Sequence, residues 1–378
     1  MREHWRSTLA LTLSVAVLST GCQDRDPPTA PATGSATGAG FKIAPAQGPY
    51  EEIGPAVWDI AAAPDGGILV ARNTTILEIR TDGIEEIRTV PTTPGSPVNG
   101  IAPVGRASLF ATSGGLDLAA GAGVWHVSRG RARLVGDVAA FETDNDPDAF
   151  EGPMWKNQAC EEDPGQGFSA GPQSNPYHLT AVDGGTALVA DAAGNSLLSV
   201  ETNGTVDWVA VFTPPVDASG DYRFLKPALS DSGIDCYVQP VPNSVAIGPD
   251  GDWYVGELTG APAVPGWSRV WRIEEGSRHV TCPSAACEML ADGFTSIIDL
   301  EFGPDGWLYV VELDEASWLA AIGVIPPAGG TVNRCDPGTG LCEVVASGLE
   351  LPGAIAFDDR GTAWILENSF DPTVRTLD

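Results

Sequence analysis

The sequence predicts an all-β protein, a six-bladed β-propeller, and three observations support this fold class. A unit of two short β-rich runs joined by a turn recurs along most of the chain. Its turn position falls at spacings of 40, 79, 66, 55 and 55 residues, at Gly66, Arg106, Gly185, Gly251, Gly306 and Gly361. Mostly-strand repeats of roughly 40 to 50 residues are typical of propeller blades. A single blade cannot cover both of its faces, so the ring has to close.

The clearest copy of the unit is Ser296–Glu312, in which Pro304-Asp305-Gly306 joins two apolar runs. Proline fixes φ, the aspartate bonds its own main chain, and glycine accepts a positive φ, so this tripeptide predicts a tight hairpin turn. Further copies, the last three of them looser, are Trp58–Arg72, Asn243–Glu257, Pro97–Thr112, Pro176–Asp191 and Pro352–Glu367.

The first 21 residues predict a bacterial signal peptide of the lipoprotein type. Arg2 and Arg6 precede an apolar run, Leu9–Leu18, that is too short to span a bilayer. Ser19-Thr20-Gly21-Cys22 resembles a lipobox, although leucine is commoner than serine at its first place. We therefore expect Cys22 to be lipidated; an ordinary signal peptide with an incidental Cys22 is the alternative.

Residues 22–40 contain nothing large and apolar to bury and predict a flexible linker, which leaves 41–378 for the propeller. The chain has 20 Lys and Arg against 50 Asp and Glu, a net charge of −30. This charge excludes nucleic acid as a partner and leaves the lipid anchor as the only expected contact with a membrane. We expect an exported monomer of the bacterial envelope: an outer-membrane lipoprotein, or a periplasmic or extracellular protein.

Six cysteines remain after Cys22, and an even number in an exported chain favours disulfides over zinc, because the chain has neither a C-x-x-C pair nor a nearby histidine. The short spacings of Cys282–Cys287 and Cys335–Cys342 predict two pinched hairpins. Cys160–Cys236 is then the third pair.

The blades follow in chain order, with two irregular insertions. Blade one has predicted strands Val57–Ala62, Ile68–Arg72, Thr75–Arg80 and Ile84–Val90, and the later blades begin near Val98, Pro176, Val241, Phe294 and Pro352. The insertions, 141–173 and 213–239, show no alternating apolar runs, and we expect loops there. Blade six ends after three strands, so its outer strand is expected from Phe41–Ala44 at the start of the domain.

Several of these segments resemble the ScyD/ScyE family, which is similar to NHL-repeat propellers and is named from gene clusters for the pigment scytonemin. The resemblance covers residues 50–378 and is carried by the middle blades, at Asn175–Leu179, Val189–Asn195, Ser244–Gly251, Val255–Gly260 and Gly293–Leu300. It implies an exported six-bladed propeller and brings no catalytic motif.

The residues seven places before each turn position form a polar row at the start of the predicted innermost strands. They are Asp59, Asn99, His178, Ser244, Asp299 and Ala354. A buried polar side chain needs a partner, so each one either bonds a neighbouring blade's main chain or faces a ligand in the central channel. We predict a ligand site from Asp59, Asn99, His178, Asn243, Ser244 and Asp299, in which Asp59 and Asp299 could hold Ca²⁺ or Mg²⁺.

A second row is acidic and comprises Asp191, Glu257, Glu312 and Glu367. One structural hydrogen bond per blade explains this row better than a set of metal ligands does. The run Asp144–Asp148 alternates like a calcium loop but lacks its glycine and its distal glutamate.

These observations predict an exported propeller that binds a small metabolite or an envelope protein at the mouth of its channel. The alternative is an enzyme, either a divalent-metal-dependent hydrolase resembling lactonases or a pigment-biosynthesis enzyme. Asn243 resembles a lactonase ligand, but the other expected ligands do not line up with it.

Overall fold

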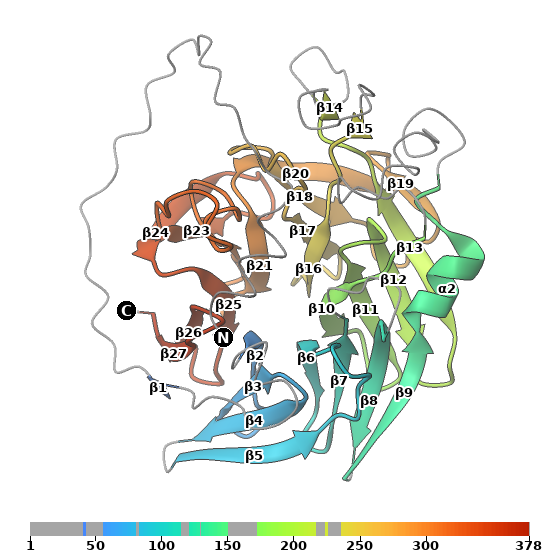
Figure 1. Cartoon of the computed structure of the whole chain (residues 1–378), viewed down its shortest axis with the longest axis vertical. Helices are drawn as coiled ribbons and strands as arrows, with labels where there is room; N and C mark the ends of the chain where they lie inside the picture. Colours follow the sequence, from blue (N-terminus) through green and yellow to red (C-terminus); the bar gives the residue numbers. More distant parts are fainter. Residues whose placement is uncertain are drawn as a thin grey trace.

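The computed structural model shows six small antiparallel sheets arranged in a ring, which confirms the six-bladed propeller (Figure 1). It describes residues 41–42, 56–80, 83–114, 121–128, 130–149, 172–216, 224–225 and 236–377. No helix within these ranges is long and apolar enough to cross a membrane.

Blades one and two each contain four strands that run in order from the innermost to the outermost. Blade one comprises β2 (Val57–Ala62), β3 (Ile68–Arg72), β4 (Thr75–Arg80) and β5 (Gly83–Thr89). Blade two comprises β6 (Val98–Val104), β7 (Ser108–Ser113), β8 (Gly123–Ser128) and β9 (Arg131–Asp137).

Blade three gains a fifth strand that the sequence did not predict. Its own strands are β10 (Pro176–Ala181), β11 (Thr186–Asp191), β12 (Ser196–Glu201) and β13 (Val206–Phe212). Strand β19 (Val280–Cys282), which comes from the following blade, pairs in parallel with β13. The disulfide Cys282–Cys287 therefore links blade three to the outermost strand of blade four.

Blades four and five have four strands each. Blade four comprises β16 (Pro242–Ile247), β17 (Trp253–Glu257), β18 (Ser268–Ile273) and β20 (Cys287–Phe294). Blade five comprises β21 (Ile297–Phe302), β22 (Leu308–Glu312), β23 (Gly330–Cys335) and β24 (Cys342–Leu349). The second disulfide, Cys335–Cys342, closes the β23–β24 hairpin as predicted.

Blade six is closed by the N-terminal segment, as expected. It comprises β25 (Pro352–Phe357), β26 (Ala363–Glu367) and β27 (Thr373–Thr376). Strand β1 (Phe41–Lys42) pairs antiparallel with β27, so both ends of the domain meet in one sheet.

The insertions contain more regular structure than the sequence indicated. The first begins with helix α2 (Val138–Asn145), because Asp137 caps its N-terminus by accepting a hydrogen bond from the Ala140 amide. The loop expected from residue 141 is therefore corrected to a helix at its start. The second contains a two-residue hairpin of β14 (Phe224–Leu225) and β15 (Cys236–Tyr237). The predicted pair Cys160–Cys236 includes Cys160, which lies outside the described residues.

The hydrophobic core lies between the blades. Six buried clusters each join one blade to the next, including the cluster in which Val70 of blade one and Ala356 of blade six take part. The repeated turn has its predicted geometry, since φ is +94° at Gly66, +92° at Gly251 and +80° at Gly306. Equivalent residues of the six blades therefore converge on one axis.

Candidate functional site

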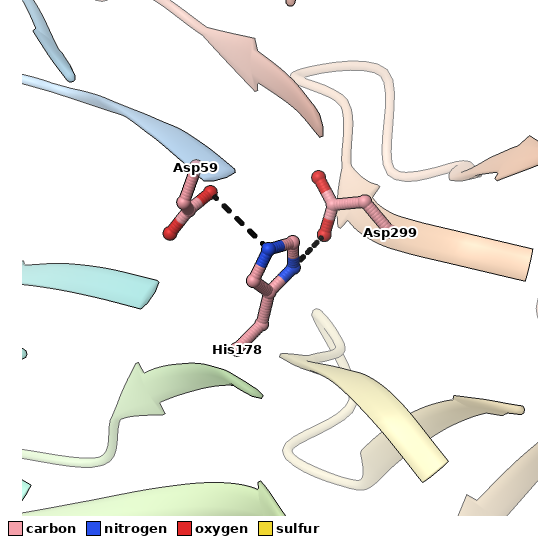
Figure 2. A group of neighbouring side chains, drawn as sticks. All are labelled: Asp59, His178 and Asp299. Carbon is pink, nitrogen blue, oxygen red and sulfur yellow. Dashed lines mark hydrogen bonds and ion pairs between the residues drawn. The ribbon is translucent and has the colours of Figure 1, made fainter. Parts of the chain in front are cut away.

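Three charged residues of the polar row meet at the axis, and they come from alternate blades. Asp59 lies on β2, His178 on β10 and Asp299 on β21. Figure 2 shows the imidazole of His178 between the two carboxylates. Its Nδ1 lies 2.9 Å from Asp299 Oδ1, and its Nε2 lies 3.9 Å from Asp59 Oδ1. We call these three residues the channel triad.

A bulge in each innermost strand positions the row. In all six blades the pairing of that strand with its neighbour shifts at this place. Such a shift redirects the adjacent side chains. In blade three it brings the consecutive rings of Tyr177 and His178 into a stack, with centroids 4.7 Å apart.

Main-chain groups of the following blades hold both carboxylates in place. Asp59 Oδ2 accepts a 2.8 Å hydrogen bond from the Ile101 amide of blade two. Asp299 Oδ2 accepts one of 2.8 Å from the Ile355 amide of blade six. The triad thus connects five of the six blades around the channel.

The electrostatics of the triad favour a charged histidine. Burial alone would lower the pKa of His178, but the carboxylates of Asp59 and Asp299 raise it to about 9. Burial, assisted by the charge of Asp299, raises the pKa of Asp59 to about 7 against the opposing effect of His178. At neutral pH the ring therefore carries two N–H groups, which donate to Asp299 and, over 3.3 Å, to the Trp58 carbonyl oxygen.

Aromatic residues adjoin two members of the triad in the chain, since Trp58 precedes Asp59 and Tyr177 precedes His178, whose ring it stacks on. Trp58 and Tyr177 are half-buried. Phe370 is 44% exposed and meets Trp58 edge-on, with ring centroids 5.7 Å apart. Trp58 Nε1 is buried and has no hydrogen-bond acceptor among the described residues. The Tyr177 ring is therefore the aromatic side chain with a described contact to the triad.

The other predicted site residues lie on the innermost strands of blades two and four, Asn99 on β6 and Asn243 and Ser244 on β16, and the two asparagines bond the neighbouring blade. The Asn99 amide donates to the Pro176 carbonyl at 3.1 Å, and the Asn243 amide donates to the Ile297 carbonyl at 3.0 Å. Ser244 is fully buried. Its Oγ and the Oδ1 of Asn243 have no hydrogen-bond partner within the described part of the chain.

The acidic row is structural, as expected. Each carboxylate accepts hydrogen bonds within its own blade region. Asp191 accepts from Ser174 Oγ at 2.6 Å, Glu312 from Asn333 Nδ2 at 2.6 Å, and Glu367 from Arg375 Nε at 2.6 Å. Glu257 is fully buried and binds both Arg269 and Trp271.

A second group of carboxylates lies where blade two passes into blade three. Glu142, Asp146 and Asp148 offer oxygens that all lie within 4.8 Å of one another. Burial raises the pKa of Glu142 to about 10, with further increases from the charges of Asp191, Asp148 and Asp146. The alternating run from Asp144 signalled two of these residues in the sequence. No sequence signal distinguished Glu142 from the other acidic residues of the insertion.

Comparison with solved structures agrees with the fold. A candidate oxidoreductase (glucose dehydrogenase) from Thermus thermophilus is 16% identical, with a TM-score of 0.51 over 85% of this chain and 97% of that one. A protein of unknown function from Bacteroides thetaiotaomicron is 11% identical, with a TM-score of 0.52 over 90% and 72%. A candidate gluconolactonase is 12% identical, with a TM-score of 0.50 over 91% and 93%.

At these identities the likeness shows the fold alone, a six-bladed β-propeller. No protein-family model matches the chain, and no curated protein matches it. The propeller part of the sequence resemblance is therefore supported, whereas no match singles out the ScyD/ScyE family.

Proposed function

We propose that this chain is an exported β-propeller that binds a small molecule at the mouth of its central channel. The observation that carries the proposal is the channel triad, in which side chains from three alternate blades meet around one imidazole. The other predicted site residues with described side-chain bonds, Asn99 and Asn243, bond only the adjacent blade. A histidine that reaches across the axis makes a polar floor at the place where propellers bind ligands.

The chemistry of the site indicates the kind of ligand. Above about pH 7, where Asp59 is ionised, two carboxylates and one imidazolium leave the floor with one excess negative charge, and hydrogen-bond donors or cations are attracted to it. Tyr177, whose ring stacks on His178, provides an aromatic group beside that charge, which suits a flat ring or an organic cation. We therefore expect a ligand that joins an aromatic ring to an amine or to another donor.

Phenethylamine and its anionic counterpart phenylpropionate provide a direct test. Calorimetry on the mature chain at about pH 8, where Asp59 is ionised, should show saturable binding of the amine and none of the anion. Asp59→Asn keeps an oxygen for the Ile101 amide and removes the excess charge, so it should weaken amine binding by about tenfold or more. Equal binding of both probes, or an unchanged affinity in this variant, would contradict the proposed floor. An envelope protein that binds this face while neither probe does would favour protein recognition instead.

The cellular location of the protein depends on the predicted signal peptide and on Cys22, which lie outside the described ranges. The two disulfides fit an exported protein. We expect Cys22→Ala to abolish palmitate labelling and to release the chain from the membrane fraction, because one cysteine carries the whole anchor. Labelling that persists in the variant would show that Cys22 is not the lipidated residue.

A metal-dependent hydrolase is the second candidate, because the channel triad brings three ligand atoms within 4.8 Å of one another. The described arrangement does not fit a divalent ion there. Both ring nitrogens of His178 already lie within hydrogen-bond distance of an oxygen, of Asp299 and of the Trp58 main chain, and each carboxylate also accepts a main-chain amide. Metal would have to displace a proton and break the bond to Asp299, so the triad as it stands favours binding.

A further inference from the structure

A carboxylate is buried without a partner beneath helix α2. Glu142 is 1% exposed, and neither of its carboxylate oxygens has a hydrogen-bond partner among the described residues. It lies four positions after Val138, on the helix face that packs against the ring, and these two residues are the buried ones of the helix. Burying an ionised carboxylate without a counter-charge is among the most unfavourable events in folding. The described residues supply neither a counter-charge nor a hydrogen-bond donor at this position, so the carboxyl is either protonated or neutralised by a bound cation.

The neighbours of Glu142 add to the negative charge. The ligand oxygens of Asp146 and Asp148 lie within 4.8 Å of one of its own, and Asp148 is only 8% exposed. Asp191, at the end of β11, approaches from blade three. A Cβ built on Gly194 would lie 3.2 Å from both Glu142 Oε2 and Asp191 Oδ2, so these two oxygens border the same small space. Within the described ranges, no arginine, lysine or histidine forms an ion pair with Glu142, Asp148 or Asp191.

The local backbone holds this arrangement in place. Asp146 ends the helix in the left-handed region with φ of 43°, and its amide donates to the Glu142 carbonyl oxygen at 2.8 Å. Asp148 Oδ2 accepts a 2.9 Å hydrogen bond from Asn195 Nδ2, which belongs to the turn between β11 and β12. Asn195 Oδ1 accepts in turn from the Val241 amide at 3.2 Å. The carboxylates are thus fixed by main-chain and amide groups, and Glu142 remains available.

We propose that Glu142, Asp146 and Asp148 bind one calcium ion, with Asp191 adding negative charge from blade three. The donors are all hard oxygens, and calcium takes six to eight of them in flexible geometry, often with one bidentate carboxylate. Zinc prefers nitrogen and sulfur, and magnesium requires a nearly ideal octahedron. Bound calcium would attach α2 and the start of the first insertion to blade three.

The test measures calcium binding and thermal unfolding of the mature chain with CaCl₂ or EDTA. We expect one tight site per chain and a rise in Tm of roughly 5 °C when calcium is in about hundredfold excess over Kd. Glu142→Gln keeps the shape and removes one charge, so it should weaken binding by about a hundredfold and remove the rise in Tm. In EDTA the same variant should melt close to the wild type, because a carboxyl without a cation at this position is protonated and neutral. Asp148→Asn provides a second variant with the same expected loss of binding.

Asp144→Asn is the matched control. Asp144 belongs to the same acidic run, but its side chain is exposed, so the variant should bind calcium as the wild type does. Asp299→Asn should also retain the ion, since the channel is a separate site. A wild type without a calcium-dependent rise in Tm would overturn the proposal. So would calcium binding that survives in Glu142→Gln, which would mean diffuse attraction to the surface charge, or binding that is lost in Asp299→Asn.

Discussion

Glu257→Ala is expected to destabilise the folded protein by about 3 to 5 kcal/mol, one of the two largest effects that we predict for a single substitution. Glu257 is fully buried, and its carboxylate accepts hydrogen bonds from Arg269 Nε and from Trp271 Nε1, each at 2.6 Å. Removing it leaves the Arg269 guanidinium, itself 6% exposed, with only the Thr213 carbonyl as a described hydrogen-bond partner. Because an unpaired buried cation is so unfavourable, the loss should exceed the value of the hydrogen bonds alone.

The free energy of unfolding is best measured by urea titration at about pH 8, because burial raises the pKa of Glu257 to about 7 even though Arg269 opposes this increase. Glu288→Ala in the same blade is the matched control. Glu288 pairs with Arg272 at 3.7 Å, but its side chain is 66% exposed. Its loss should cost less than about 1 kcal/mol. Similar losses in the free energy of unfolding for Glu257→Ala and Glu288→Ala would show that burial does not determine how strongly the Glu257–Arg269 pair stabilises the fold.

The fold was predictable because its signal is local and repeated. Pro-Asp-Gly turns such as Pro304-Asp305-Gly306 encode a backbone geometry within three residues, and the spacing of the copies gives the number of blades. The strands β2 to β4 match the predicted ranges for that reason. Strand β19 and helix α2 were missed, since they depend on pairing with another blade and on one capping residue, Asp137.

The candidate site was only partly predictable. Equivalent positions in a repeat identify which residues approach the axis, and this brought Asp59, His178 and Asp299 together. The sequence could not show that Asn99 and Asn243 turn to the next blade, because one bulge per blade decides the direction of each side chain. Glu142 was missed for a similar reason. Its burial depends on how a helix of one insertion packs on the ring.

His178→Gln is the second substitution for which we expect a loss of about 3 to 5 kcal/mol, because it removes the cation between two buried carboxylates. The partner variant should behave differently. Asp59→Asn removes one of the two negative charges, and burial already raises the pKa of Asp59 to about 7. Glutamine at position 178 leaves two like charges facing each other, whereas asparagine at position 59 leaves a neutral pair. We therefore expect Asp59→Asn to cost less than about 1 kcal/mol or to stabilise the protein.

The stabilisation of the fold by charged His178 depends on pH, because the pKa of His178 is raised. Its folded-state pKa of about 9 is above the ordinary value of 6.5, so its charge stabilises the fold fully below pH 6.5. That stabilisation, roughly 3 kcal/mol, is lost as the pH rises through 9. The pKa of Asp59 is raised from 3.8 to about 7, so ionising this buried carboxyl lowers the stability of the fold as the pH rises from 3.8 through 7. Nitrogen-15 NMR of the imidazole should show both ring nitrogens protonated at about pH 7.5.

The same nitrogen-15 spectrum tests what raises the pKa of His178. Asp299→Asn removes the carboxylate that lies 2.9 Å from Nδ1, so burial, which opposes the charged ring, should bring the pKa of His178 well below 9. Asp144→Asn, at the exposed helix position, should leave the imidazole titration unchanged. A neutral ring at pH 7.5 in the wild type, or equal losses of stability for His178→Gln and Asp59→Asn, would mean that the triad is not held by a central positive charge. In that case the excess negative charge that we assign to the channel floor would no longer follow from the structure.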